Sequence, residues 1–240
     1  MKKSNPTIIL VRPQLSENIG MAARAMDNFG LSKLSIVSPR DGWPSNKAKD
    51  TSKHGIKIIT NAKIFNNLEE SLKDYNFVIA TSNRKRFLTK KTYNDFNIFK
   101  KNIYEHNKVA ILFGPENSGL SNHDLRLANF IFTIPTANSN KSINLSHAVT
   151  LISHELFNFN STIDSSDKIM KSDKVTKLDL SNYLDFLIKD LESKDFFNPV
   201  EKKESMIDNI YSIYNKIDLS KKELRMLWGM HKKLKNQPKS

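Results

Sequence analysis

Cysteine is absent from the 240 residues, and no apolar run approaches the roughly 18 residues that a membrane span requires. The first absence excludes a disulfide framework, a thiolate metal site and a cysteine nucleophile. The chain begins with two lysines like a secretory leader, but the apolar run Thr7–Val11 ends at Arg12 and is too short for one. We therefore expect a soluble cytoplasmic protein with no membrane partner.

Several familiar motifs are incomplete. Gly114 and Gly119 have the spacing of a phosphate-binding P-loop, but Leu120 stands where that loop requires a lysine. No G-x-G-x-x-G pattern follows the first apolar run, and the six histidines lack H-E-x-x-H spacing. Nucleoside triphosphate hydrolysis, an ordinary dinucleotide fold and a metal site are therefore not indicated.

Positive charge is abundant and uneven. Lysine and arginine total 38 against 25 acidic residues, a formal net charge of +13. Residues 1–160 hold 22 basic and 12 acidic side chains, which leaves +10 of that charge in the first two thirds of the chain. Such a surface suits a polyanion, nucleic acid first, although a lysine-rich composition that only maintains solubility explains the charge about equally well.

Short β-branched runs without strict polar alternation are typical of strands buried on both faces. They lie at residues 7–11, 34–38, 56–59, 77–81, 108–113 and 130–134. Helical patterns lie between and after them, near residues 18–29, 45–53, 66–73, 94–102, 121–128 and 144–159. This alternation predicts an α/β fold with a mostly parallel sheet, forming one domain over residues 1–160.

The last third of the chain has a different pattern. Residues 161–176 are polar and rich in serine, aspartate and lysine, which predicts a linker. Residues 177–240 contain three amphipathic helical patterns and form a small C-terminal helical domain. About 60 residues make a small core, so we expect this part to pack on its own main domain or on a second subunit.

Two segments in the main domain combine glycine with a charged residue. The loop 114–119 follows an apolar strand, where open α/β sheets bind ligands, and it carries Glu116. In the first predicted helix Gly20, Arg24 and Asp27 fall on one face, so Gly20 leaves space in which Arg24 can fork onto a phosphate. A plain strand–turn–helix connection and a surface Arg24–Asp27 pair are the alternatives, and the spacing alone leaves them open.

Three ordered segments together resemble the SPOUT class of RNA 2′-O-ribose methyltransferases, in its SpoU/TrmH branch. They are Asn18-Ile-Gly-x-x-Ala-Arg24-Ala, Leu112-Phe-Gly114-Pro-Glu116-Asn-Ser-Gly119-Leu, and the stretch from Ile134-Pro135 to Ser142-Ile-Asn144-Leu145-Ser-x-Ala148. Agreement of three segments is stronger evidence than any one motif. The tail pattern Phe196-Phe-x-Pro199, followed by Leu224-Arg225-x-Leu227-x-Gly229-Met230, is similar to bacterial members acting on pyrimidine 32 of the tRNA anticodon loop.

The resemblance implies a fold and a cofactor that periodicity does not. It implies a deep trefoil knot at the C-terminal end of the sheet domain, a homodimer, and RNA running across the subunit boundary. It also implies that S-adenosylmethionine binds in three loops of the knot. The implied cofactor-binding residues are Thr81, Ser82, Asn83, Gly114, Glu116, Gly119, Ile134, Pro135, Ser142, Ile143, Asn144 and Leu145.

By the same resemblance Arg24 is the central catalytic residue, which binds the target phosphate and helps to activate the ribose hydroxyl. Ser142 orients Arg24 or the ribose, and Asn144 caps the last helix of the domain and braces the cofactor site. Glu116 holds Arg24 or the hydroxyls of the cofactor ribose, and Asn18 bonds Glu116 or RNA. A normal guanidinium stays protonated, so we expect Arg24 to position and stabilise rather than to take the proton.

A basic segment follows the first implied cofactor loop. Its five positive residues are Arg84, Lys85, Arg86, Lys90 and Lys91, with no acid among them. RNA backbone phosphates are the natural ligand for such a segment, and a solvated basic loop is the alternative. The sequence thus favours a tRNA 2′-O-methyltransferase. Activity on ribosomal RNA or another tRNA position, and an inactive RNA-binding protein, remain as alternatives.

Overall fold

Seven strands form one parallel sheet in the computed structural model, which describes residues 5–84, 90–137, 139, 141–160 and 173–235. The strand order is β3-β2-β1-β6-β4-β7-β5. The strands are β1 (Thr7–Val11), β2 (Leu34–Val37), β3 (Lys63–Phe65), β4 (Phe77–Thr81), β5 (Thr92–Tyr93), β6 (Val109–Phe113) and β7 (Phe130–Phe132). Every neighbouring pair is parallel, so the α/β prediction is confirmed.

Helices follow most strands, as parallel connections require. They are α1 (Ser16–Asn28), α2 (Asn46–Ser52), α3 (Ile56–Thr60), α4 (Leu68–Leu72), α5 (Phe96–Glu105), α6 (Asn122–Arg126), α7 (Leu145–Asn160), α8 (Lys177–Glu192), α9 (Lys203–Lys216) and α10 (Lys221–Lys235), with 3-10 turns η1 (Lys53–Gly55) and η2 (Val200–Lys202). Within the described residues, none of these helices has the combination of length and apolarity that crossing a bilayer needs.

One predicted strand is wrong. Residues 56–59 form helix α3, and the strand of this region is β3, which starts at Lys63. Ile58 and Ile59 are adjacent, yet both are buried in the first cluster of core residues together with Ala23 of α1, whereas adjacent residues of a strand point to opposite faces of the sheet. Gly55 lies against the backbone of Ala23 in α1, which fixes the chain in a helical turn here. Packing against α1 therefore overrides the β-branched composition.

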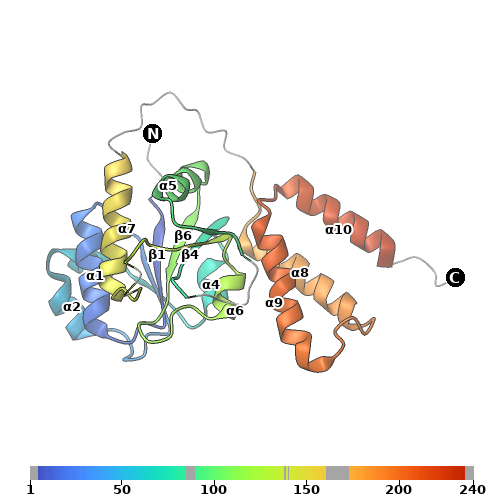
Figure 1. The fold of residues 1–240 in the computed structure, drawn as a ribbon, viewed down its shortest axis with the longest axis horizontal. Coiled ribbons are helices and arrows are strands. Elements are labelled where there is room, and N and C mark those ends of the chain that lie inside the picture. The colour runs from blue at the N-terminus through green and yellow to red at the C-terminus, as the bar shows by residue number, and fades with distance from the viewer. Residues whose placement is uncertain (1–4, 85–89, 138, 140, 161–172, 236–240) are drawn as a thin grey trace.

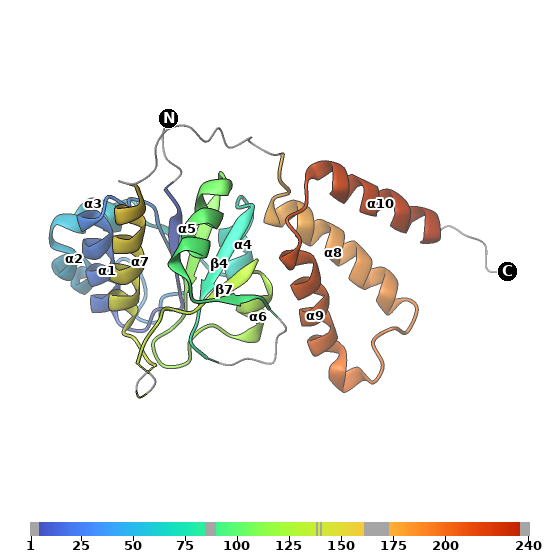
Figure 2. The ribbon, with the colours of Figure 1, turned by 45° about the horizontal axis from the view of Figure 1, so that its top comes forward.

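Two hydrophobic clusters lie on the two faces of the sheet. Alternate β1 residues separate between them, with Ile8 and Leu10 in the first cluster and Ile9 and Val11 in the second. The first cluster takes its helical side chains from α1, α2, α3, α5 and α7. The second takes them from α4 and α6 and from the C-terminal helices α8, α9 and α10. Figures 1 and 2 show α8 and α9 beside α4 and α6, on the side of the sheet away from α1 and α7.

The C-terminal helices pack on their own main domain, which is one of the two arrangements expected from the sequence. Val175, Leu180 and Leu184 are buried in the second cluster together with sheet residues. The backbone N–H of Lys177 donates to the carbonyl oxygen of Tyr75 at 2.8 Å. The helical segment is therefore continuous with the core of the sheet domain.

The predicted linker is too long at its C-terminal end. Residues 161–172 lie outside the described residues, but 173–176 are placed by specific contacts. Lys174 pairs with Ser220 in an isolated β-bridge, and Thr176 forms a capping box with Asp179 at the start of α8. Composition predicted a linker up to residue 176. Its last four residues, 173–176, instead initiate α8 and contact the turn before α10.

Candidate active site

A cavity of about 320 Å³ opens where three loops meet. One loop follows β4, one follows β6, and one runs from β7 to α7. In a parallel sheet these loops share one edge, and β6, β4 and β7 are neighbours in it. The cavity is lined by Thr81, Ser82, Asn83, Arg84, Phe113, Gly114, Pro115, Glu116, Gly119, Ile134, Lys141, Ser142, Ile143, Leu145 and Ala148.

Most of the predicted cofactor residues line this cavity. Those that do are Thr81, Ser82, Asn83, Gly114, Glu116, Gly119, Ile134, Ser142, Ile143 and Leu145. Pro135 and Asn144 do not line it, and Asn144 acts on the wall from behind, as described below. Lining residues that the sequence did not assign to a cofactor include Phe113, Lys141 and Ala148. All three lie in or beside the motif segments, and this position in the sequence is the signal that could have identified them as lining residues.

Glu116 is fixed by the start of α1. Its carboxylate accepts hydrogen bonds from the backbone N–H of Gln14 at 2.8 Å, the N–H of Leu15 at 3.3 Å and the Asn18 side-chain amide at 2.8 Å. Leu15, the residue before α1, offers no side-chain cap of its own. A carboxylate from the β6 loop therefore satisfies amide donors at this helix N-terminus, where negative charge is favoured. The predicted Asn18–Glu116 hydrogen bond is confirmed.

Asn144 extends this network to the third loop. Its side-chain oxygen accepts from the Ser146 N–H at 2.9 Å, which caps α7 as predicted, and its amide donates to Asn18 Oδ1 at 3.2 Å. Asn18 is only 2% exposed. The chain Glu116–Asn18–Asn144 thus joins α1 to two of the three loops that enclose the cavity.

The first loop is bonded to the other two. Asn83 donates to the carbonyl oxygen of Lys141 at 2.6 Å, and the Thr133 hydroxyl donates to the carbonyl of Ser82 at 2.8 Å. Arg84 donates from its guanidinium to the carbonyl of Asn117. Among the described residues, the loop after β4 is therefore hydrogen-bonded directly to both other loops, and those two are joined to each other through Asn18.

The two loop glycines have different roles. Gly119 has a left-handed backbone, φ 63°, which favours glycine, and an added Cβ there meets only Arg84 side-chain atoms at 3.7 Å. At Gly114 an added Cβ would overlap the backbone of Leu120 and Gly119. The space beside the Gly114 Cα is therefore filled by the backbone of the loop itself.

Arg24 is exposed on α1 and is not part of the cavity wall. The prediction that Gly20 clears a surface for Arg24 is wrong. Gly20 is buried, and an added Cβ would overlap Thr51 and the carbonyl of Ala48 in α2. Glycine is needed here for close helix packing, and among the described residues no ion pair joins Arg24 to Asp27.

The basic segment divides into different environments. Lys85 and Arg86 lie outside the described residues, and Lys91 is exposed. The Lys90 ammonium donates to the carbonyl oxygens of Arg126 and Ala128, and burial lowers the pKa of Lys90 to about 6. Lys90 is therefore an internal anchor, contrary to its predicted role at RNA phosphates. Nothing in the local sequence distinguishes it from Lys91.

No cluster of three or more histidine, cysteine, aspartate or glutamate side chains that could hold a metal ion occurs in the part of the chain that the structure describes. The cavity is lined by apolar residues such as Phe113 and Leu145, by polar residues of the three loops, and by the charged residues Glu116, Arg84 and Lys141. Such a wall suits an organic ligand that carries an aromatic part and polar edges.

Residues 5–154 match the SpoU rRNA Methylase family. The chain therefore belongs to this family of methyltransferases. A curated relative from Haemophilus influenzae, described as an uncharacterized tRNA/rRNA methyltransferase, is 30% identical over 94% of this chain and 92% of its own.

Two further proteins are similar along almost the whole chain. The Pseudomonas aeruginosa tRNA (cytidine/uridine/adenosine-2′-O-)-methyltransferase TrmJ is 28% identical over 93% of this chain and 91% of its own. The crystal structure of TrmJ from Z. mobilis ZM4 superposes with a TM-score of 0.87 at 34% identity, covering 96% of this chain and 99% of that one. The likeness thus includes the C-terminal helices.

Proposed function

We propose that this chain transfers a methyl group from S-adenosylmethionine to the 2′-hydroxyl of a tRNA ribose, at pyrimidine 32 of the anticodon loop. The observation that carries the proposal is the cavity enclosed by three loops and tied to α1 through Glu116, Asn18 and Asn144. Membership of a methyltransferase family and the similarity to proteins named TrmJ support the reaction and the tRNA substrate.

The cavity fits the proposed cofactor in its chemistry. Phe113, Ile134 and Leu145 offer apolar surface for an adenine ring, and the loop backbones offer hydrogen bonds to its polar edge. Glu116 would contribute a negative charge to the site that holds the cationic donor, and its carboxylate also accepts three N–H hydrogen bonds at the start of α1. When bound, the cofactor supplies an electrophilic methyl group. We infer that the loops thread as the deep trefoil knot of this class.

The chain's own residues must align the ribose oxygen and assist loss of its proton. In this proposal Arg24 holds the phosphate of the target nucleotide and stabilises charge that develops on the 2′-oxygen, while a phosphate oxygen or solvent takes the proton. Ser142 lines the cavity and orients the ribose. Asn18, Glu116 and Asn144 hold the loops and α1 in register.

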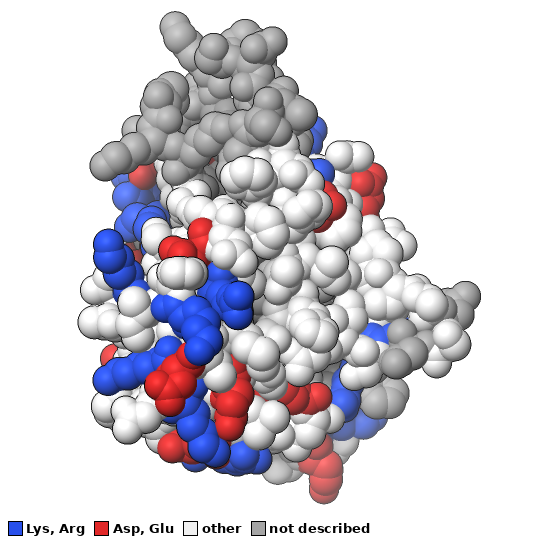
Figure 3. Space-filling model, turned by 90° about the vertical axis from the view of Figure 1, so that its left-hand side faces the viewer, with Lys and Arg blue, Asp and Glu red and all other residues white. Residues whose placement is uncertain are grey.

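The place of Arg24 supports a homodimer. Arg24 is exposed outside the cavity, and the same side of the molecule exposes the apolar side chains Met21 of α1 and Leu151 and Phe157 of α7. Figure 3 views this side and shows a broad uncharged area beside a band of mixed basic and acidic residues. A second copy packed on this area would bury the apolar side chains and bring Arg24 to a shared site.

Incubation with methyl-labelled S-adenosylmethionine and bulk tRNA tests the proposal, followed by mapping of the labelled nucleotide. Label is expected at a ribose of position 32. Arg24→Lys keeps the charge but loses the two-pronged contact, and we expect at least a hundredfold lower rate with unchanged cofactor binding. Near-normal activity of this variant would remove Arg24 from the mechanism. Label in ribosomal RNA alone would overturn the tRNA substrate, and RNA binding without label would identify an inactive member.

A further inference from the structure

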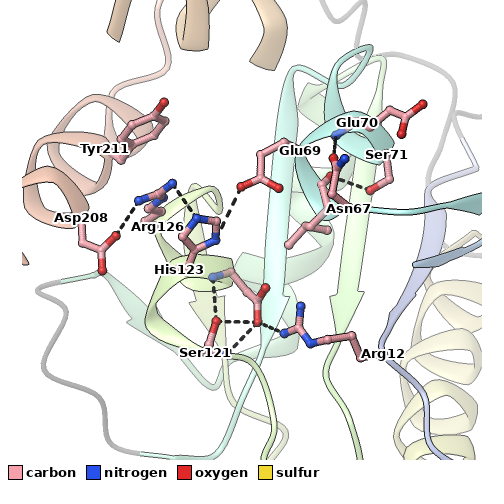
Figure 4. A network of polar contacts seen from close by, with 12 residues as sticks. Arg12, Asn67, Glu69, Glu70, Ser71, Ser121, His123, Arg126, Asp208 and Tyr211 are labelled. Atoms are coloured by element: carbon pink, nitrogen blue, oxygen red, sulfur yellow. Dashed lines mark hydrogen bonds and ion pairs between the residues drawn. The ribbon is translucent and has the colours of Figure 1, made fainter. Parts of the chain in front are cut away.

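Helix α6 connects the cavity to the C-terminal helices. It starts directly after the loop that carries Gly114, Glu116 and Gly119, and it has only five residues. At its first turn Ser121 and Asp124 form a capping box, and Asp124, which is 2% exposed, also pairs with Arg12, the residue after β1. Figure 4 labels Ser121 and Arg12 on the two sides of this contact. The N-terminal end of α6 is thereby fixed to the sheet.

The other end of α6 is held by α9. Arg126 donates from Nη1 to Asp208 Oδ1 at 2.8 Å, and its guanidinium carbon lies 4.5 Å from the ring centroid of Tyr211 (Figure 4). The Arg126 and Asp208 side chains are only 15% and 18% exposed. An ion pair so far removed from water is screened less than a surface pair, and loss of one partner leaves a poorly solvated charge.

A helix of five residues has no stability of its own, so its contacts decide where α6 lies. Leu125 is buried in the second cluster, and Lys90 holds the carbonyl oxygens of Arg126 and Ala128, but neither contact reaches the C-terminal helices through a polar group. The remaining side-chain link to α4, between His123 and Glu69 at 3.5 Å, joins two exposed side chains and is weak. Arg126 is therefore the main polar connection between α6 and the C-terminal helices among the described residues.

A displacement of α6 would reach the cavity wall. Leu120, the residue between the loop and the α6 cap, is fully buried, and the loop backbone packs tightly on Gly114. Glu116 is bonded to three N–H groups at the start of α1, so it cannot follow a shift without breaking hydrogen bonds. Close-packed segments of this kind pass on small movements instead of absorbing them.

We propose that Arg126 is a positioning residue, through which the docked C-terminal helices hold the loop 114–121 in the conformation that binds the methyl donor. The identity of the ligand rests on the proposed function. Loss of the Arg126–Asp208 contact weakens binding at a cavity that neither residue lines.

Calorimetric titration with S-adenosylhomocysteine, the demethylated product, tests this in Arg126→Gln and Asp208→Asn. At a temperature where circular dichroism finds the variants fully folded, we expect affinity to fall about tenfold, within the usual range for coupled sites. Amide hydrogen exchange should accelerate in residues 114–121, and KM for the donor should rise while kcat at saturating donor is kept. The matched control is Lys203→Gln, which breaks the Lys203–Glu192 ion pair within the C-terminal segment and should change none of these.

A charge exchange sharpens the test. Arg126→Asp combined with Asp208→Arg should recover part of the lost affinity. The proposal would be overturned if Arg126→Gln binds S-adenosylhomocysteine with the parental affinity, keeps the parental rates of amide hydrogen exchange and only melts at a lower temperature. Arg126 would then only stabilise the fold. If the parent protein binds neither donor nor product, the proposed function fails. In that case, the rate of amide hydrogen exchange in residues 114–121 of the ligand-free variants still decides whether Arg126 holds the loop.

Discussion

The two faces of the sheet are covered in different ways. The first face is covered by helices of 13, 10 and 16 residues, α1, α5 and α7, all from the part of the chain that forms the sheet. On the second face, the described residues of that part supply only α4 and α6, of five residues each. The C-terminal helices complete the cover. The C-terminal segment has the sequence pattern of an appended domain, but its helices cover the second face of the sheet and form part of the hydrophobic core.

Removal of residues 173–240 should have the largest effect. It uncovers the second face by removing the buried side chains Val175, Leu180, Tyr183, Leu184, Tyr211 and Leu224. At about 1.5–3 kcal/mol for each large side chain, the lost burial is comparable to the whole stability of a domain. We expect the shortened chain to aggregate, as measured by size-exclusion chromatography. A monodisperse product with the parental melting temperature would show the second face to be self-sufficient.

On the first face, Gly20→Ala should cost about 3 kcal/mol, because the added methyl group overlaps the carbonyl of Ala48 and overpacking forces the backbone to move. Gly229→Ala in α10 is the matched control, since nothing lies within 4 Å of its added Cβ. There we expect a gain of up to about 1 kcal/mol from helix propensity. Urea unfolding measures both. Equal effects would mean that α1 and α2 are not closely packed.

The free energy of unfolding should depend on pH through the second face. Lys177 donates to Asn129 Oδ1 at 2.8 Å and to Asn215, and burial lowers its pKa from the ordinary 10.5 to about 7. Between pH 7 and 10 the unfolded chain therefore binds more protons than the folded one. Stability rises with pH there, by up to about 1.4 kcal/mol per unit for this group.

Lys177→Met should flatten this rise in denaturation curves taken across the same pH range. Lys90, with its pKa lowered in the same direction, keeps part of the slope. Lys189→Met, which removes an exposed lysine of α8, should leave the slope as it is. An unchanged slope in Lys177→Met would mean that Lys177 is solvated in the folded protein.

The smallest effects belong to ion pairs on the first face. Lys101→Gln removes an exposed pair with Glu105 in α5 and should change stability by less than about 0.5 kcal/mol. Lys100→Gln should cost more, about 1 kcal/mol, because Lys100 is 11% exposed and joins α5 to Glu155 of α7 at 3.1 Å. Chemical denaturation of the two variants measures the free energy of unfolding of each. The reverse order would contradict the burial argument.

Much of the fold follows from the sequence because the signals are local. Four apolar residues follow Thr7 in the run Thr7–Val11, which is a strand over its whole length, and Asn144 precedes an amphipathic pattern that it caps. Close packing at Gly20 and the burial of Lys90 depend on residues far along the chain, Ala48 for one and Ala128 for the other. Periodicity has no access to such contacts. The residues that line the cavity could be predicted from the sequence only because they lie in the family motifs.

The position of β6 has a consequence for synthesis of the protein. β6 pairs with β1 on one side and with β4 on the other, although both precede it in the chain. Until Val109–Phe113 emerges from the ribosome, the nascent chain holds two open sheet edges that are rich in β-branched residues. The cavity also cannot exist before this insertion, because one of its loops follows β6. Productive folding of the sheet is therefore a late event in the synthesis of this chain.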